Sequence, residues 1–317
     1  MERIDVRILG GGHNWLTIGG RIALGLDGYY SRLPKGSTAS VTTADPGEMC
    51  FQSVELVCSG AFHMAITTPA WMVRLAMEGR DPFDRPMPVR ALAHFPHDDR
   101  MAFAVRKECG IDTFGELRER KYPLKVSTVP PENRHPAVWA TEIILNEHGI
   151  TFEDIESWGG KLLRDRPRFI NQPGIAPASP GFDAIFDEAL MTRRWTTLTE
   201  QHDIVFLPVE EEVLQRLETE RGWKRGVIER TRYRGMTEDV PTVDFSGWIL
   251  FCCEDMDDEL AYLTIAALDE QKGEIEALFP QPHAALTGPV DLSWLGSNVP
   301  VPLHPGAEKY YREKGYL

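Results

Sequence analysis

The sequence is poor in basic residues and has no long apolar run. Of its 317 residues, 34 are Lys or Arg and 48 are Asp or Glu, which gives a formal net charge of -14 at pH 7. Affinity for nucleic acids and for anionic membranes depends on Lys and Arg, so nucleic acid and membrane surfaces are excluded as partners. No stretch approaches the 18 apolar residues of a membrane-spanning helix, so no direct membrane insertion is expected.

A secretory signal pattern is also absent, and cysteine is scarce. The opening "MERIDVRILGG" has no charged segment followed by an apolar one. An odd number of cysteines, including an adjacent pair in an apolar run, suits a reducing compartment, although small core residues explain them equally. They are Cys50, Cys58, Cys109, Cys252 and Cys253. The sequence as it stands predicts a cytoplasmic protein, or a periplasmic one if a leader has been removed.

Motifs that bind nucleotides or metals are missing as well. The stretch "RILGGGHNWLTIGGRIA" (residues 7–23) has the strand, glycine turn and helix start of an anion site, but Trp15 stands where a dinucleotide turn needs its third glycine. His13 and Asn14 stand where a Walker-type loop needs Lys and Ser or Thr. No HxH, HExxH or CxxC spacing occurs, so we expect neither a metal ion nor another cofactor. The turn still predicts a seat for a small anion.

Strand and helix patterns alternate along most of the chain. Apolar strands such as "DVRILG", "HMAITT" and "VRALAHF" are separated by helical patterns, and a second series runs through "PLKVST", "FDAIFD" and "DIVFLP". This alternation indicates βαβ units, mainly parallel sheets and the α/β fold class. The length of the chain favours two domains over a single core.

One long segment has no secondary-structure pattern. Residues 164–181, "RDRPRFINQPGIAPASPG", are dense in Pro, Gly and Arg. A structureless segment of this length in a compact domain is usually functional or disordered. A mobile flap over a binding site and a solvated insertion are both consistent with its composition.

Several stretches together resemble a known family. They are "VELVCSGAFHMAITTPAW" (54–71), "VRALAHFPHDDRMAFAVRKECGIDTFGELRERKYPLKVST" (89–128), "EDVPTV" (238–243) and "VPVPLHPGAEKYYREKG" (299–315). In these stretches the chain resembles the TAXI-type solute-binding proteins of TRAP transporters. The resemblance covers nearly the whole chain, and the C-terminal stretch is its most specific part.

The resemblance implies an architecture and a function. The fold would be a two-domain α/β fold of the periplasmic-binding-protein type II kind, with a ligand cleft between the domains. The crossing strands would be "AFAVRK" and the region of "TVDFSGWILF", so domain 1 comprises residues 1–104 and 246–317 and domain 2 comprises residues 105–245. A small carboxylate-containing ligand would be captured by a hinge motion and delivered to TRAP transporter membrane subunits.

Ligands of open α/β sheets bind beyond the carboxyl ends of the strands, and this rule selects the candidate ligand-binding residues. They follow expected strands or begin expected helices: His13, Asn14, Trp15, Gly47, Thr67, Thr68, Asn133, Arg134, His135 and Glu188. Arg134 is the first choice for a carboxylate, because its planar fork matches two oxygens. Arg100 and Arg193 are second choices, and a surface salt bridge is the alternative role for any of the three.

Two stretches depart from the family pattern. "TVPPENRHP" (128–136) replaces a turn of small residues, so side chains take over part of a backbone anion cradle. "DAIFDEALMTRRW" (183–195) carries the acidic pair Asp187 and Glu188, followed by arginines, where the family has aromatic, apolar and small residues.

These departures favour a second hypothesis, a cytosolic enzyme on the same scaffold, such as a decarboxylase of an aromatic or dicarboxylic acid. This lyase would need a proton donor, and His13, His97 and His135 are the candidate catalytic residues. Each of these histidines has a helix cap or a hydrogen bond to a carboxylate as its alternative role. In "HFPHDDR", Asp98 and Asp99 are expected to form a solvated turn between two strands.

Overall fold

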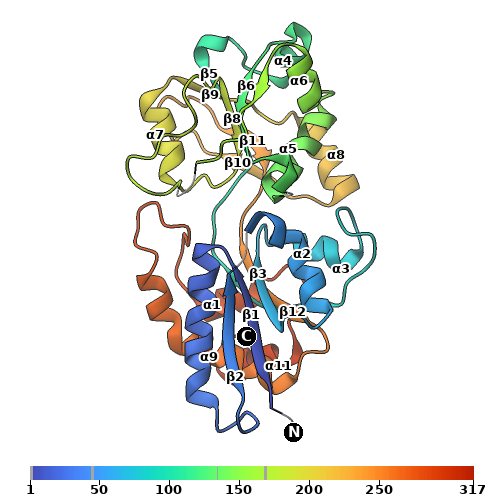
Figure 1. Cartoon of the computed structure of the whole chain (residues 1–317), viewed down its shortest axis with the longest axis vertical. Helices are drawn as coiled ribbons and strands as arrows, with labels where there is room; N and C mark the ends of the chain where they lie inside the picture. Colours follow the sequence, from blue (N-terminus) through green and yellow to red (C-terminus); the bar gives the residue numbers. More distant parts are fainter. Residues whose placement is uncertain (1–2, 44–45, 134, 168–169) are drawn as a thin grey trace. The chain divides into compact units, whose positions relative to one another are not determined.

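The computed structural model describes residues 3–43, 46–133, 135–167 and 170–317 (Figure 1). The chain divides into two compact units: unit 1 comprises residues 1–97 and 246–317, and unit 2 comprises residues 98–245. Each unit has its own five-stranded sheet. The predicted fold class, α/β with two domains, is confirmed.

Unit 1 is built on a sheet with the strand order β2-β1-β3-β12-β4. The strands are β1 (Asp5–Gly11), β2 (Thr38–Thr43), β3 (Met64–Thr67), β4 (Val89–Phe95) and β12 (Trp248–Cys253). Strand β1 pairs in parallel with β2 and β3, whereas β12 pairs antiparallel with β3 and β4. Every residue of β12 is buried, as its continuous apolar run predicts.

Helices cover both faces of this sheet. They are α1 (His13–Gly25), the 3-10 helix η1 (Leu26–Tyr29), α2 (Pro46–Cys58), α3 (Met72–Glu78), α9 (Asp258–Ala277), α10 (Leu292–Ser297) and α11 (Pro305–Glu313). Helices α1 and α9 pack together on one face, and α2 and α3 lie on the other (Figure 1). Right-handed connections place α1 and α2 on opposite faces, because the chain moves from β1 to β2 in one direction and then back across β1 to β3 in the other.

Helix α11 approaches α9 at a glycine. A Cβ added to Gly306 would lie 2.0 Å from the backbone oxygen of Asp258, at the start of α9. We expect Gly306→Ala to lower the free energy of unfolding by about 2 kcal/mol or more, because backbone must move to admit the methyl group. Gly273→Ala in α9 is the matched control, since nothing lies within 4 Å of that position. Equal urea midpoints for the two variants would contradict this close approach.

Unit 2 is built on a sheet with the strand order β7-β6-β8-β5-β9. The strands are β5 (Ala102–Arg106), β6 (Lys125–Ser127), β7 (Lys161–Leu162), β8 (Ala184–Asp187) and β9 (Ile204–Phe206). Strand β6 pairs in parallel with β7 and β8, whereas β5 pairs antiparallel with β8 and β9. The fourth strand in each order, β12 in unit 1 and β5 in unit 2, is the first strand that the chain forms after it crosses from the other unit. Residues 98–104, assigned to domain 1 from the sequence, lie in unit 2 because β5 pairs there.

The remaining elements of unit 2 surround this sheet. They are η2 (Lys107–Cys109), α4 (Phe114–Arg120), η3 (Pro131–Asn133), α5 (Pro136–Glu147), α6 (Phe152–Ser157), α7 (Arg193–Gln201), α8 (Glu211–Arg221) and the antiparallel ribbon of β10 (Arg225–Ile228) and β11 (Val240–Val243). Helix α5 begins where the sequence allows it. His135 is the N-cap, and Pro136 occupies the first helical position, where its missing N–H costs nothing.

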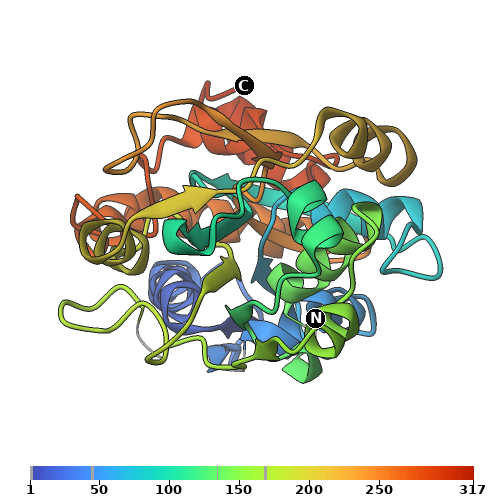
Figure 2. The same cartoon turned by 90° about the horizontal axis from the view of Figure 1, so that it is seen from above.

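Unit 2 differs from unit 1 in one connection. Unit 1 joins its second and third strands through helix α2, whereas unit 2 joins β7 to β8 through residues 163–183, which contain no helix in their described part. Figures 1 and 2 show this segment as an open stretch of chain beside α7. Ala178 and Phe182 nevertheless pack into a core cluster with Trp195 and Leu198 of α7. The segment is therefore anchored in the core of unit 2 rather than being a solvated insertion.

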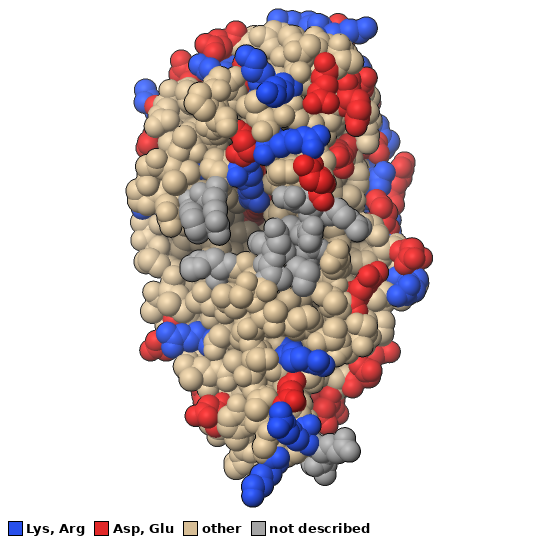
Figure 3. All heavy atoms as spheres, viewed as in Figure 1, with Lys and Arg blue, Asp and Glu red and all other residues tan. Residues whose placement is uncertain are grey.

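The charged surface contrasts with this core. Figure 3 shows positive and negative side chains interspersed on one face. Exposed ion pairs include that of Arg164 with Glu132, 2.8 Å apart. Among the described residues, no helix has the length and apolar character that crossing a bilayer requires. Unlike these surface charges, the charged side chains at the carboxyl ends of the parallel strands of unit 2 are buried.

Candidate functional site

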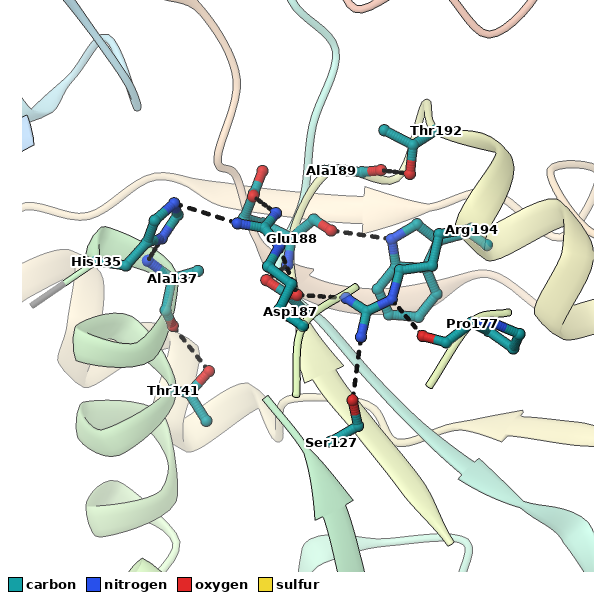
Figure 4. Close-up of polar contacts among 12 residues, drawn as sticks. Ser127, His135, Ala137, Thr141, Pro177, Asp187, Glu188, Ala189, Thr192 and Arg194 are labelled. Atoms are coloured by element: carbon teal, nitrogen blue, oxygen red, sulfur yellow. Dashed lines mark hydrogen bonds and ion pairs between the residues drawn. The ribbon is translucent and has the colours of Figure 1, made fainter. Parts of the chain in front are cut away.

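A buried cluster of charged side chains lies at the carboxyl ends of three parallel strands of unit 2 (Figure 4). Strand β6 leads to the N-terminus of α5 at His135, β7 leads into the segment that carries Arg166, and β8 ends at Asp187 and Glu188. The carboxyl ends of parallel strands meet at one edge of a sheet, so residues distant in the sequence come together here. This edge is where α/β sheets bind their ligands.

Asp187 is the centre of the cluster. Its side chain is 0% exposed, and its Oδ2 forms ion pairs with Arg194 Nη1 and with Arg166 Nε, the latter at 3.0 Å. Its Oδ1 accepts a hydrogen bond of 2.9 Å from the backbone N–H of Glu188. One carboxylate therefore positions two guanidinium groups.

Arg194 is buried as completely as Asp187. Its Nε donates to the carbonyl of Pro177 at 2.7 Å, and its Nη2 donates to the hydroxyl of Ser127 at 3.1 Å. Its backbone N–H donates to the carbonyl of Ile170 at 3.0 Å. Burial lowers the pKa of Arg194, and Asp187 opposes that shift by stabilising the charge. This residue links the end of β6, the end of β8 and the segment 163–183.

Arg166 reaches from the cluster toward solvent. Its side chain is 18% exposed, whereas the side chains of Asp187 and Glu188 are 0% and 8% exposed. Its Nη2 donates to Glu188 Oε1. Burial disfavours its charge, but the carboxylates of Asp187 and Glu188 outweigh that penalty and raise its pKa.

His135 brings a second donor to Arg166. Its Nδ1 accepts from the backbone N–H of Ala137 at 3.1 Å and so caps α5. Because that N–H is fixed by the helix, we assign the proton of the neutral ring to Nε2. Nε2 is 3.2 Å from Arg166 Nη1, which also carries hydrogens. Burial, followed by the charge of Arg166, lowers the pKa of His135 to about 4, so the ring is neutral at physiological pH.

Asp99 and Glu188 form a carboxyl pair behind Arg166. Asp99 is fully buried and accepts backbone N–H groups from Arg100, Leu190 and Ala189 at 2.7, 2.9 and 3.0 Å. Three such bonds fix the orientation of its carboxyl group. Burial is the main factor that raises the pKa of Glu188, and Asp99 adds to it. The expected solvated turn is wrong for Asp99, because its carboxylate holds the backbone after β8.

The structure brings together some of the predicted site residues within each unit. His135 and Glu188 both contact Arg166 in unit 2. In unit 1, Trp15 is 7% exposed and its ring meets Trp248 edge-on at 6.3 Å. The His97 ring stacks on Trp248 with the ring centres 4.5 Å apart, and His97 Nδ1 lies 2.7 Å from the carbonyl oxygen of Ala285.

Other predicted residues have local partners or lie outside the description. Thr67 and Thr68 are buried, and their hydroxyls donate to the carbonyls of Cys50 at 3.3 Å and Gly247 at 3.1 Å. Asn14 is half-buried in α1, Gly47 lies in α2, Arg193 is exposed at the start of α7, and Arg100 pairs with Asp98 and Asp244. Arg134 and the side chains of His13 and Asn133 lie outside the described residues.

The sequence analysis missed Arg166 and missed the role of Arg194. Both lie in stretches that it singled out, the segment 164–181 and the departure "DAIFDEALMTRRW". An arginine in a Pro- and Gly-rich segment gives no periodicity from which its burial can be predicted. The signal that remained was composition: two arginines close to an Asp-Glu pair that follows an apolar strand.

Comparisons with known proteins give remote similarities. The sequence model of the NMT1-like family matches residues 184–315, which is less than half of the chain. No curated protein matches the sequence.

Several solved structures are similar in fold. The TctC solute-binding protein from Polaromonas is 14% identical, with 89% of each chain covered and a TM-score of 0.45. The putative sulfonate ABC transporter protein SsuA, a periplasmic sulfonate-binding protein from Methylobacillus flagellatus KT, is 13% identical, with 88% of this chain and 73% of that chain covered and a TM-score of 0.42. Iron-bound HitA from Pseudomonas aeruginosa is 12% identical, with 99% of each chain covered and a TM-score of 0.41.

Proposed function

We propose that the chain is a solute-binding protein that captures a small carboxylate-containing ligand and delivers it to the membrane subunits of a TRAP-type transporter. The match of residues 184–315 to the NMT1-like family and the TAXI-type stretches of the sequence support this class of protein. One observation carries the choice of ligand: with the His135 proton assigned to Nε2, two N–H donors, Arg166 Nη1 and His135 Nε2, lie 3.2 Å apart.

An oxyanion can accept a hydrogen bond from each of these two donors, whereas the donors cannot form a hydrogen bond with each other. Two N–H groups in contact repel, whereas a carboxylate oxygen placed between them accepts from both. The N-terminus of α5 adds its dipole, which favours negative charge. Arg166 Nη2 already donates to Glu188, and its Nε lies in an ion pair with Asp187, so the guanidinium is held in place before the ligand arrives.

In this proposal the ligand lies in a cleft between the two domains, and binding closes that cleft by a hinge motion about the crossing strands. Asn14 and Trp15 of unit 1 stay candidate ligand residues on the sequence argument, as does Arg134. The chain would act in the periplasm after export.

Arg166→Gln tests the proposal. We expect it to weaken carboxylate binding at least about tenfold, or ~1.4 kcal/mol, because a charge-assisted hydrogen bond to the ligand is lost. Native mass spectrometry of the purified protein would first identify any retained acid. Dissociation constants for acetate, succinate, glutarate, benzoate and phthalate would then be measured by calorimetry.

Arg164→Gln is the matched control, because Arg164 lies in the same segment and pairs only with the exposed Glu132 among the contacts described for it. Its affinities should equal those of the wild type. Arg134→Ala belongs in the same series as a test of the sequence-based choice. Unchanged affinity in Arg166→Gln would remove this cluster from the binding site.

A further inference from the structure

We propose that Arg194 is a positioning residue for ligand binding: it contacts no ligand but fixes Asp187 and the segment 163–183 so that Arg166 presents its Nη1 to the ligand. This inference rests on the proposed function. It assigns a binding role to a residue whose side chain is 0% exposed.

Arg194 tethers the segment that carries Arg166. Its backbone N–H holds the carbonyl of Ile170, and its Nε holds the carbonyl of Pro177, so one residue fixes the segment at two points. No helix orders the described part of this segment, unlike the corresponding connection in unit 1. The segment is also held by the backbone N–H of Arg193, which donates to Asn171 Oδ1 at 3.2 Å, and by the packing of Ala178 and Phe182 in the core. The side chain of Arg194 adds the bond to Pro177, and a substitution at this position removes that bond.

Arg194 also determines how Asp187 meets Arg166. Arg194 Nη1 pairs with Asp187 Oδ2, and the same oxygen is left with Arg166 Nε at 3.0 Å, in an ion pair whose N–H is not aligned as a hydrogen bond. A guanidinium prefers to face a carboxylate with two parallel N–H groups. Both oxygens of Asp187 are engaged, Oδ2 by Arg194 and Oδ1 by the backbone N–H of Glu188, so the fork of Arg166 points instead to Glu188 and His135. Removing Arg194 frees Oδ2, so Arg166 turns toward that oxygen and withdraws Nη1.

Arg194→Lys is the first test, because it keeps the charge beside Asp187 and removes the planar fork that reaches Pro177 and Ser127. We expect affinity for the five carboxylates to fall about tenfold, and amide hydrogen exchange in residues 163–183 to become about tenfold faster. Glu200→Gln is the matched control, since that side chain is exposed in the same helix, α7. It should change neither quantity.

A double-mutant cycle separates positioning from a structural role. If Arg194 acts through Arg166, Arg194→Lys lowers affinity in the wild type but has no further effect on Arg166→Gln. Additive effects, or faster exchange with unchanged affinity, would overturn the inference and leave Arg194 a structural residue. If Arg194→Lys does not fold, Arg194→Gln, which leaves Asp187 with Arg166 as its counter-charge, replaces it in the cycle.

The same data distinguish failure of the inference from failure of the proposed function. If Arg166→Gln alone binds as tightly as the wild type, the proposed function fails whatever Arg194 does. If Arg166→Gln loses affinity and Arg194→Lys does not, only the positioning role fails.

Discussion

Replacing Asp187 with alanine is expected to lower the free energy of unfolding by about 3–5 kcal/mol, as measured for buried ion pairs that lose one partner. The side chains of Asp187 and Arg194 are both 0% exposed, so the change leaves a guanidinium without its carboxylate and without water. The removed carboxyl atoms account for little of this effect through lost packing. The main cost is the uncompensated charge of Arg194.

Two variants make this prediction specific. Asp187→Leu combined with Arg194→Met removes both charges and should recover much of the lost stability, because apolar replacements of a buried pair are often tolerated. Glu132→Ala breaks the exposed pair with Arg164 in the same unit and should leave the urea midpoint where it is in the wild type. If the double variant is no more stable than Asp187→Ala, the cost arises from packing and not from the unpaired charge.

The sequence predicts the scaffold of this site better than its chemistry. The strands "KVS" and "AIFD" and the helix after His135 follow from apolar patterning and from proline after a capping residue. The rule for the carboxyl ends of parallel strands then selects His135 and Glu188, which the structure brings to the same arginine. These features depend on local patterns that a single sequence displays.

Burial of charge does not follow from local patterns. Arg193 and Arg194 are adjacent at the start of α7, yet one is exposed and the other is buried, because the helix turns its successive residues to different sides. Asp98 and Asp99 differ in the same way, and only Asp99 receives three backbone N–H groups. Arg166 depends on a segment whose path is fixed by contacts with α7. Such placements depend on tertiary structure, which composition and periodicity do not encode.

His135 gives the second large expected effect, a loss of stability on acidification. Its pKa is lowered from 6.5 to about 4 in the folded protein, mainly by burial. Between these two values the unfolded chain binds more protons than the folded one, so the free energy of unfolding falls as the pH falls. The difference of pKa corresponds to about 3 kcal/mol, which is present above pH 6.5 and is lost as the pH approaches 4.

His135→Asn isolates this contribution, because asparagine keeps an acceptor for the N–H of Ala137 at the helix N-cap but does not titrate. Two other groups also make the free energy of unfolding depend on pH. Burial lowers the pKa of His148, which adds to the loss of stability at low pH. The pKa of Glu188 is raised, and this has the opposite effect, because a carboxyl with a raised pKa in the folded protein stabilises the protein at low pH. Both groups remain in the variant, so they largely cancel in the comparison. Urea unfolding of both proteins between pH 7 and pH 4 should show the wild type losing about 3 kcal/mol more than His135→Asn. Parallel pH profiles would mean that the pKa of His135 is not lowered in the folded protein, and its contribution to acid sensitivity would then be excluded.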